Sequence, residues 1–375
     1  MRIKIMLLAV LTTSCTTLKY ASNQKITDKK DCVNVTLNGL IGIQIELENK
    51  SQHFFVDTGA MISTLLDSTA IENFSDKKLG SFGKNISADK TKKQNRFLTA
   101  RLSCPLFESK NKMLNLSLMP ESNCSKGKYF KGILGLDVFF EDKTALVLDF
   151  TNNKICNIDI ASIAQKLNES KGYKLLKSEC KQNQIFVYVT IEGKEFKFKL
   201  DTGYTGNMII PQSEKIQFSN TNTMILEGTL YITVSSYTSG VEIYYEKMPM
   251  VFAGESFDAK VNVSSSIKVQ NMGINFIKCF DWIIDYNNNK VYVKRNGNKI
   301  ESNFNRKVSY YAKVTKDKLM ISVKEKSQTK YNLGNQIISV NEKKITTENA
   351  CEMQDFLNKT EDWNTLQLEV IPSSK

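Results

Sequence analysis

The triplet Asp-Thr-Gly occurs twice in this 375-residue sequence, at Asp57-Thr58-Gly59 and at Asp201-Thr202-Gly203. Two carboxyl groups held close together do not both ionise easily, so one keeps a proton while the other stays charged. Such a pair can deprotonate water and protonate a carbonyl group, as peptide-bond hydrolysis without a metal or covalent intermediate requires. The glycines permit tight turns, and the threonine hydroxyls can hydrogen-bond between facing loops. The sequence therefore predicts one composite site with Asp57 and Asp201 as its catalytic residues.

Other hydrolytic chemistries lack the residues they need. The one histidine, His53, precedes Asp57 in a strand pattern, so a Ser-His-Asp triad or a Cys-His pair would have to use it beside the proposed site. We interpret His53 as a half-buried strand residue. No His/Cys cluster has the spacing of a zinc site, and no glycine-rich phosphate loop follows a strand. We therefore expect neither a metal nor a cofactor.

The segments around the two triplets resemble each other. Each triplet is preceded by a strand closing on a turn glycine and by a second strand that leads into it. Each is followed later by an apolar residue with glycine, a short amphipathic turn, an apolar strand and an Asn-rich turn. These patterns lie at residues 33–39 and 185–193, 51–64 and 194–209, and 131–155 and 270–291. Three ordered repeats indicate a duplicated domain.

The duplication and the composition divide the chain into six segments. Two lobes of nearly equal length carry the triplets, and a strand-rich tail without Asp-Thr-Gly follows them. We predict an export signal at 1–15, a linker at 16–30, a first lobe at 31–160, a linker helix at 161–178, a second lobe at 179–300 and a tail domain at 306–375.

The two loops resemble those of the pepsin and retropepsin superfamily of aspartic peptidases, most closely bacterial two-lobed members with retropepsin-like halves. The resemblance covers about Cys32–Arg295. Asp57-Thr58-Gly59-Ala60, followed by Ser63-Thr64, is a close match to the family loop. Asp201-Thr202-Gly203-Tyr204 is a looser match, because a small residue is usual after the glycine.

A second motif of this family is a pair of apolar residues and a glycine that pass close to the catalytic loop. Ile133-Leu134-Gly135 resembles it fully. Met272-Gly273 resembles it in part, because Asn271 stands where an apolar residue is usual. The second copy has therefore diverged further than the first.

The resemblance implies a mainly β fold with two homologous retropepsin-like β-barrel lobes in a pepsin-like bilobal arrangement. It implies an aspartic endopeptidase that takes a peptide or protein substrate as a monomer, with the two lobes forming an intramolecular pseudo-dimer. It also implies that two glycines, Gly135 and Gly273, pack against the catalytic loops. The residues that would support these loops are Thr58, Gly59, Ala60, Thr202, Gly203 and Tyr204.

The resemblance also implies an extended peptide in the interlobe cleft beneath a β-hairpin flap. Two hairpins are candidates, Phe82–Leu102 and Gly228–Tyr245, and the sequence leaves both open. Relatives that act in acid have a Ser or Thr after the glycine, which favours the charged carboxylate. Ala60 has no hydroxyl and that of Tyr204 is too distant, so we expect an optimum at weakly acidic or neutral pH.

The tail resembles a PDZ domain. A strand at Leu319–Val323, a turn and strand at Leu333–Asn341, a helix at Thr347–Asn358 and a closing strand at Leu366–Ile371 carry the resemblance. Gly334 is the one glycine in these elements, so the usual glycine-rich loop that binds a peptide carboxylate is not evident. The tail either recruits substrates or adaptors, which we favour, or packs on the lobes.

The N-terminus predicts export. Arg2 and Lys4 precede an apolar stretch that ends in small residues before Cys15. This segment resembles a bacterial lipoprotein signal, which implies lipidation of Cys15 and a membrane anchor in the cell envelope, facing the periplasm or in the outer membrane. Plain secretion is the alternative.

Export exposes the remaining cysteines to an oxidising setting, where disulfides persist. Cys104 with Cys124 and Cys32 with Cys156 are candidate pairs, and burial of several free thiols is the alternative.

The net charge of +12 arises from dispersed lysines, without an arginine-rich stripe. We interpret it as a solvated surface and expect no nucleic-acid partner.

Two other functions compete with peptide hydrolysis. The first is an exported peptide-binding or scaffold lipoprotein that keeps the fold and has lost activity, for which Tyr204 and Asn271 argue. The second is a chain in which the first lobe alone works, paired with another molecule. The presence of both triplets on one chain disfavours each of them.

Overall fold

The computed structural model describes residues 26–77, 79–118, 124, 130–140, 143–214, 216–233, 237–304 and 309–372. The predicted signal with Cys15 and most of the 16–30 linker lie outside the described residues. The described end of that linker forms a strand, β1 (Ile26–Asp28), which pairs antiparallel with β9 (Phe107–Leu116). Within the described ranges, no helix has the length and apolar character that crossing a membrane requires.

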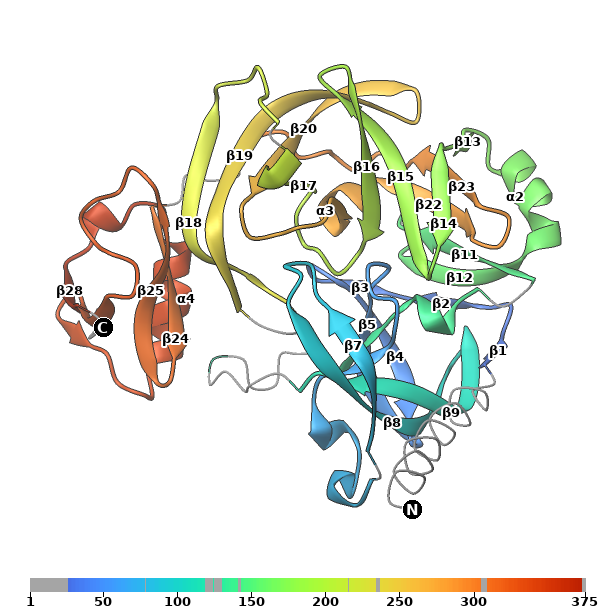
Figure 1. The fold of residues 1–375 in the computed structure, drawn as a ribbon, viewed down its shortest axis with the longest axis horizontal. Helices are drawn as coiled ribbons and strands as arrows, with labels where there is room; N and C mark the ends of the chain where they lie inside the picture. The colour runs from blue at the N-terminus through green and yellow to red at the C-terminus, as the bar shows by residue number, and fades with distance from the viewer. Residues whose placement is uncertain are drawn as a thin grey trace, which may run out of the picture.

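The protein is mainly β, as predicted, and its strands form three sheets (Figure 1). The first sheet contains β1, β3 (Thr36–Leu37), β4 (Ile41–Leu47), β5 (Lys50–Val56), β6 (Thr64–Leu65), β7 (Gly80–Ile86), β8 (Lys92–Cys104), β9 and β10 (Gly132–Leu134). Pairing of β8 with both β9 and β4 closes the order β4-β5-β10-β6-β9-β8 on itself. The first sheet is therefore a closed barrel.

The second sheet repeats this order in the second half of the chain. Its strands in this half are β14 (Ser178–Lys181), β15 (Gln184–Ile191), β16 (Lys194–Asp201), β17 (Met208–Pro211), β18 (Thr223–Ile232), β19 (Tyr237–Phe252), β20 (Glu255–Ser264) and β21 (Asn271–Gly273). The order β15-β16-β21-β17-β20-β19 closes through pairing of β19 with β15. Strand for strand, β4, β5, β10, β6, β9 and β8 correspond to β15, β16, β21, β17, β20 and β19.

Alternating apolar residues build the interior of each barrel. In β15, Ile185, Val187, Val189 and Ile191 are buried while the residues between them are partly exposed, which is the period of a strand with one face inward. The isoleucines and terminal leucine of β4 are buried in the same way. The two barrels therefore have similar interiors as well as the same topology.

A third sheet joins the two halves. Its order is β13 (Lys174–Leu175), β23 (Lys290–Arg295), β22 (Phe280–Asp285), β11 (Thr144–Asp149), β12 (Lys154–Asp159) and β2 (Cys32–Asn34). The central pair, β11 with β22, comes from corresponding places in the two repeats and places Val147 opposite Ile283. The predicted linker helix appears as α2 (Ile163–Glu169), followed by β13.

Within the described part of the chain, the remaining helices are short. They are η1 (Ser68–Ala70), η2 (Phe74–Asp76), η4 (Leu136–Val138), η5 (Ile160–Ser162), η6 (Gln212–Glu214) and α3 (Ile274–Ile277) in the two halves, and α4 (Ala350–Lys359) and η7 (Trp363–Thr365) in the tail.

One predicted repeat is misplaced by a hairpin. The turn at Asn38-Gly39 joins β3 to β4, so residues 33–37 are not the counterpart of 185–190. The hairpin that leads into Asp57 is β4–β5, and its turn consists of Glu48 and Asn49 at positive φ, 50° and 65°. A turn without glycine gave no sequence signal, which explains the error.

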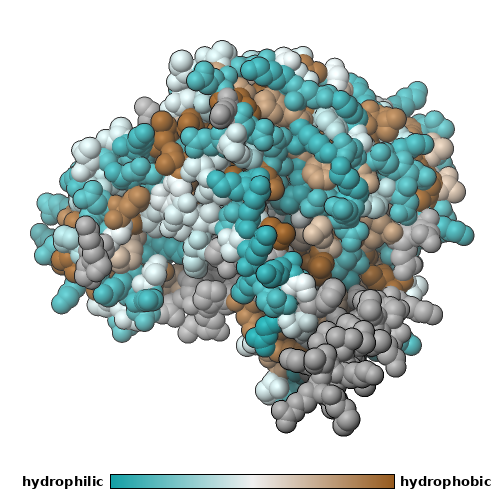
Figure 2. Space-filling view, in the orientation of Figure 1, coloured by the Kyte–Doolittle hydropathy of each residue, from teal (hydrophilic) through white to brown (hydrophobic). Residues whose placement is uncertain are grey.

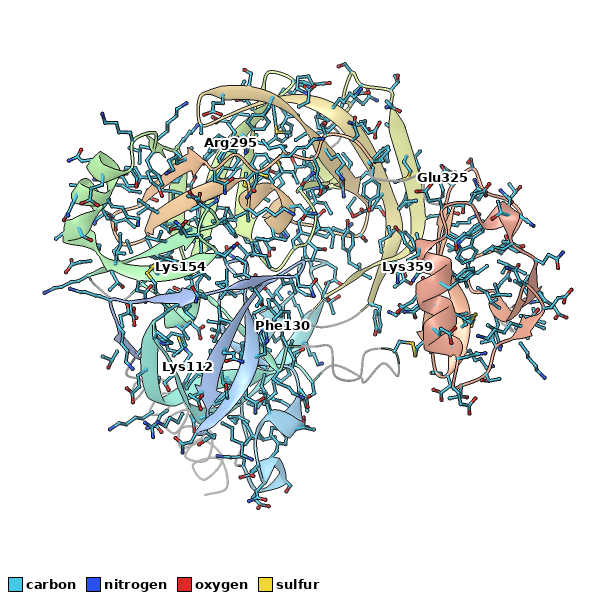
Figure 3. All side chains as sticks on the ribbon, turned by 180° about the vertical axis from the view of Figure 1, so that it is seen from behind. Lys112, Phe130, Lys154, Arg295, Glu325 and Lys359 are labelled. Atoms are coloured by element: carbon cyan, nitrogen blue, oxygen red, sulfur yellow. A yellow bond between two sulfur atoms is a disulfide. The ribbon has the colours of Figure 1, made fainter. Side chains whose placement is uncertain are left out.

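The tail has strands β24 (Tyr310–Thr315), β25 (Lys318–Glu325), β26 (Gln336–Val340), β27 (Lys343–Lys344) and β28 (Leu368–Ile371). With α4 they enclose a separate core that includes Tyr310, Ile321, Leu357 and Trp363. The tail joins the second barrel by pairing of β25 with β18, which places Glu325 opposite Leu226 (Figure 3).

Disulfides tie distant segments together. Cys32 and Cys156 are bonded between β2 and β12, as proposed from the sequence. The proposed pairing of Cys104 with Cys124 is wrong. Cys124 is bonded to Cys351 in α4, and Cys104 is a free, buried thiol in β8. The tail is therefore covalently linked to the segment that follows β9.

Candidate active site

The two barrels present their Asp-Thr-Gly loops to each other. Each loop follows the strand of its barrel that pairs in parallel with a short inner strand, β5 with β10 and β16 with β21. The Asp57 amide donates to the Leu134 carbonyl at 2.9 Å, and Asp201 lies opposite Gly273 in the ladder. The paired strands thus fix the position of each aspartate at the end of its strand.

The glycines that end this pairing contact the loops closely. A Cβ atom on Gly135 would lie 2.8 Å from the Ala60 carbonyl oxygen, and one on Gly273 would lie 2.6 Å from that of Tyr204. Such distances are shorter than a side chain tolerates. Both glycines therefore occupy the loop-packing positions that the sequence predicted for them.

The threonines form four reciprocal hydrogen bonds between the loops. The Thr58 hydroxyl accepts from the Thr202 amide at 3.1 Å and donates to the Leu200 carbonyl at 2.9 Å. The Thr202 hydroxyl accepts from the Thr58 amide at 3.0 Å and donates to the Val56 carbonyl at 2.8 Å. Both threonines are fully buried, so these bonds are shielded from water.

Each triplet glycine faces the carboxylate of the other loop. A Cβ atom on Gly59 would clash with the Asp201 carboxylate, and a Cβ atom on Gly203 would clash with that of Asp57. The two carboxylates consequently lie between the loops, each against backbone that has no side chain. This arrangement brings together Asp57 and Asp201 from places 144 residues apart, as the paired threonines are.

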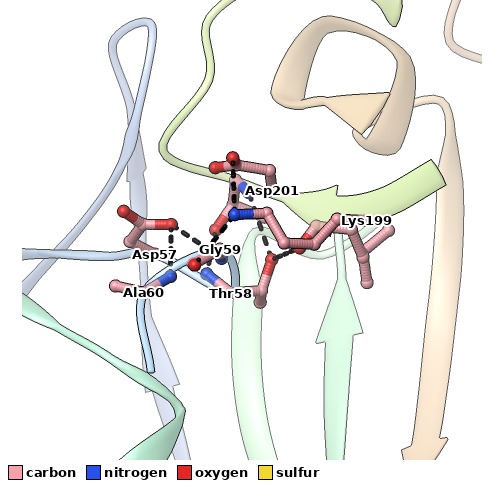
Figure 4. A network of polar contacts seen from close by, with 8 residues as sticks. Asp57, Thr58, Gly59, Ala60, Lys199 and Asp201 are labelled. Atoms are coloured by element: carbon pink, nitrogen blue, oxygen red, sulfur yellow. Dashed lines mark hydrogen bonds and ion pairs between the residues drawn. The ribbon is translucent and has the colours of Figure 1, made fainter. Parts of the chain in front are cut away.

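The Asp57 carboxylate is held by its own loop. Its Oδ1 accepts from the Gly59 amide at 2.7 Å and from the Ala60 amide at 3.1 Å (Figure 4). Burial and the nearby charge of Asp201 raise the pKa of Asp57 to about 7, although Lys199 and the Gly59 amide act to lower it. Asp57 can therefore keep a proton at weakly acidic pH.

The structure adds a residue that the sequence interpretation missed, Lys199. Its ammonium group lies 3.5 Å from Oδ2 of Asp201 and donates to the Gly59 carbonyl at 3.1 Å (Figure 4). Alternation along β16 places Phe198 and Leu200 in the core and Lys199 on the other face. At the end of the strand, that face borders the cleft. The sequence does not reveal this, because an outward-facing lysine in a strand pattern looks the same as a solvated surface lysine.

Tyr204 turns away from the carboxylates. Its hydroxyl accepts from Asn262 at 3.3 Å, and its ring lies 6.2 Å from that of Tyr231. Tyr231 in turn donates to Glu242, whose side chain is fully buried. Burial raises the pKa of Glu242 to about 7. The hydroxyl of Tyr204, the residue after the second triplet glycine, is therefore bound to Asn262 of the second barrel and not to a carboxylate of the dyad.

A cleft of about 2300 Å³ passes both carboxylates. The first barrel contributes Phe55 and Ile133 to its lining, the second Lys199 and Asn271, and the tail Lys313. On the face of the molecule that Figure 2 shows, hydrophilic and hydrophobic residues are irregularly intermixed. The cleft is large enough for an extended peptide of several residues.

Two hairpins border this cleft, and they are held differently. The turn of β7–β8 reaches the second barrel, where the Ala88 carbonyl accepts from the Lys268 amide at 2.9 Å and Asp89 accepts from the Thr238 hydroxyl at 2.8 Å. The β18–β19 hairpin is paired instead with β25 of the tail. Of the two flap candidates, Phe82–Leu102 therefore contains the hairpin that crosses between barrels.

The outer edge of β24 in the tail is occupied by α4. Asn358 accepts from the Ala312 amide at 2.8 Å and donates to the Ala312 carbonyl at 2.9 Å. Gln354 accepts from the Val314 amide at 2.7 Å. These side chains take backbone groups that an added peptide strand would need.

His53 is half-buried in β5, as predicted, with its ring edge-on to Phe130 at 4.9 Å between centroids. Across the described ranges, no three His, Cys, Asp or Glu side chains are grouped as a metal site would require.

No protein-family model matches the sequence, and no curated protein is significantly similar to it.

Proposed function

We propose that the protein is an aspartic endopeptidase whose two barrels are homologous retropepsin-like lobes. The observation that carries the proposal is the reciprocal contact of the loops, in which each triplet glycine faces the opposite carboxylate and the threonines exchange hydrogen bonds. A loop aspartate with a structural role has no need of a second carboxylate against it, where like charges repel. The strand order shared by the barrels supports their descent from one duplicated unit.

The proposed reaction uses one ionised and one protonated carboxyl group. The ionised group takes a proton from water, whose oxygen attacks the peptide carbonyl carbon while the protonated group gives its proton to the carbonyl oxygen. In the second step the C–N bond breaks, the first group passes its proton to the nitrogen, and a hydroxyl of the intermediate returns a proton to the second. The dyad is thereby restored without a cofactor.

The tail is proposed to be a PDZ-like domain that serves as a wall of the cleft. Pairing of β25 with β18 and the Cys124–Cys351 disulfide attach it to both halves. Asn358 and Gln354 occupy the β24 edge. These contacts favour packing on the lobes over the substrate-recruiting role that we favoured from the sequence.

The proposal for the whole protein is an exported lipoprotein, anchored through Cys15, that acts as a monomer on peptides or proteins in the cell envelope. Both carboxylates come from one chain, which supports the monomer over a site shared between two molecules. Secretion without an anchor is the alternative localisation.

The test is cleavage of a mixed peptide library by the chain that begins at residue 16, with fragments identified by mass spectrometry. We expect Asp57→Asn and Asp201→Asn each to lower the rate on the order of 10³-fold. Asp76→Asn, an exposed aspartate on η2, is the matched control and is expected to cleave as the wild type does. Full activity of Asp201→Asn would refute a composite dyad.

The second candidate, an inactive peptide-binding scaffold, is favoured by one observation. The ion pair of Lys199 with Asp201 engages a carboxylate that catalysis would use. This candidate predicts that the wild type binds library peptides without cleaving them and that both Asp→Asn variants bind equally well. Cleavage by the wild type excludes it.

A further inference from the structure

Corresponding positions beside the two aspartates carry different chemistry. Phe55 stands two residues before Asp57, as Lys199 stands two before Asp201. The parallel ladders place Ile133 opposite Phe55 and Asn271 opposite Lys199. An apolar pair in the first barrel is therefore replaced by a polar pair in the second, and all four residues line the cleft.

The replacement places a cation against one carboxylate. Lys199 is 3.5 Å from Oδ2 of Asp201, and the lysine side chain is 14% exposed. Its hydrogen bond to the Gly59 carbonyl fixes the ammonium group between the loops. A partly buried ion pair is screened less by water and salt than a surface pair is, so this charge acts strongly on its neighbours.

Asp57 receives no comparable charge from its own barrel, because Phe55 holds the matching place. Its Oδ1 is engaged by the amides of Gly59 and Ala60, and its Oδ2 lies toward Gly203 of the opposite loop. The two carboxylates thus have unequal surroundings although their loops have the same sequence triplet.

We propose that Lys199 assigns the two roles within the dyad: its ammonium group holds the negative charge on Asp201, so that Asp57 carries the shared proton. The inference rests on the proposed peptide hydrolysis. Asp201 then takes the proton from water and Asp57 protonates the carbonyl oxygen. Lys199 is a positioning residue, because it acts through Asp201.

The other ionisable groups near the dyad leave this assignment in place. Tyr204, Tyr231 and Glu242 form the hydrogen-bonded set behind Asp201, and burial raises the pKa of Glu242 to about 7, so it is largely uncharged at weakly acidic pH. Elsewhere along the cleft, Lys260 pairs with Glu301 at 2.8 Å, and Lys131 pairs with Asp67. The hairpin and the tail add Lys84, Lys93, Lys313 and Asp355 to the lining.

The test compares kcat/KM against pH for the wild type, Lys199→Met, Lys199→Arg and Phe55→Met. Asp57 must be protonated, so activity falls as pH rises through its pKa of about 7. Loss of the cation in Lys199→Met is expected to move this alkaline limb upward by about one pH unit. It is also expected to lower kcat about tenfold near pH 5, because the charge on Asp201 is no longer held.

The two other variants separate charge from shape. Lys199→Arg keeps the cation, so the alkaline limb of its pH profile is expected at the same pH as in the wild type. Phe55→Met changes the matching position without changing the charge, and its alkaline limb is also expected to stay in place. A limb that stays in place in Lys199→Met, or moves as far in Lys199→Arg, overturns the inference.

A second readout does not depend on activity. The carboxyl carbon of Asp57 in protein labelled with 13C-aspartate is identified by its loss in Asp57→Asn and titrated by NMR. We expect the Asp57 carbon to show the change of a whole proton with a midpoint near pH 7 in the wild type, and about half of that change in Lys199→Met, where the two carboxyl groups share the proton. If the wild type cleaves no peptide, the proposed function fails, and this titration still decides whether Lys199 sets the charge. Equal changes at the Asp57 carbon in the two proteins overturn the inference.

Discussion

In the first barrel Asp57 is held by the amides of its own loop, whereas in the second barrel Asp201 is paired with a lysine from the preceding strand. The later glycines differ in a similar way. The Gly135 amide donates to the Ser63 hydroxyl at 3.1 Å, and the Gly273 amide donates to the Asn207 carbonyl at 2.6 Å. One topology thus supports its two loops with different contacts.

The similarities and the differences lie in separate places. The threonines and triplet glycines are the same in both barrels. Each threonine contacts its counterpart, and each glycine contacts the carboxylate of the opposite loop. Positions that face the cleft differ, as Phe55 and Ile133 in the first barrel and Lys199 and Asn271 in the second show. Residues that join the two loops are therefore the same in both barrels, whereas residues that line the cleft are not.

The largest expected effect concerns the triplet glycines, which both loops have. Gly59→Ala and Gly203→Ala would each place a Cβ atom against the opposite carboxylate. We expect each to lower kcat/KM at least about 100-fold, since small displacements of reacting groups are that costly. Cleavage of a peptide selected from the library measures the effect.

The matched controls for these variants lie at the far ends of the same strands. Ser51→Ala on β5 and Lys194→Ala on β16 change exposed residues and are expected to keep wild-type activity. A large loss in one glycine variant and a small loss in the other would show that the loops do not face each other symmetrically.

The second prediction concerns stability. Thr58→Val and Thr202→Val each remove a buried hydroxyl that accepts from the amide of the opposite threonine and donates to a carbonyl of the opposite strand. We expect each to lower the free energy of unfolding by about 2–4 kcal/mol. Urea denaturation measures it, and the two values should agree within about 0.5 kcal/mol.

The double variant sharpens this comparison. The two hydroxyls serve the same pair of loops, so their substitutions are coupled, and Thr58→Val with Thr202→Val should cost less than the sum of the single changes. Additive costs, or costs that differ severalfold between the two positions, would contradict a reciprocal arrangement.

The sequence predicted the features that repeat. Alternating apolar residues indicated the β class, and the recurring triplets and later glycines identified Asp57, Asp201, Gly135 and Gly273 as residues of one site. These predictions work because each depends on a local backbone requirement or on a period along the chain.

The features that do not repeat were missed for physical reasons. Lys199 has the outward position of an ordinary solvated lysine, and only the end of β16 at the cleft gives it a partner. Cys124 and Cys351 are far apart in sequence, and their pairing depends on how the tail packs. The β4–β5 turn lacks the glycine that marks most such turns.

The smallest expected effect concerns the hairpins. The β7–β8 turn is held on the second barrel by a few side-chain and backbone bonds, while β18 is paired along its length with β19 and at Leu226–Gly228 with β25. We therefore expect faster amide hydrogen exchange in β7 than in β18. Asp89→Ala removes the acceptor of Thr238 and also that of the Ser87 hydroxyl and the Thr91 amide within the turn. Each bond is worth about 1 kcal/mol, so exchange in β7 should be at least about fivefold faster.

The counterpart in the second barrel is Lys324→Ala. It breaks the ion pair of Lys324 with Glu227 across β25 and β18, 3.1 Å long, and leaves the backbone pairing intact. Exchange in β18 should then stay within about twofold of the wild type, because the backbone pairing of β18 with β19 and β25 still holds the strand. Equal exchange of β7 and β18 in the wild type, or a larger response to Lys324→Ala than to Asp89→Ala, would mean that the tail does not immobilise its hairpin. The asymmetry would then be confined to the groups around the carboxylates, where Lys199 replaces Phe55.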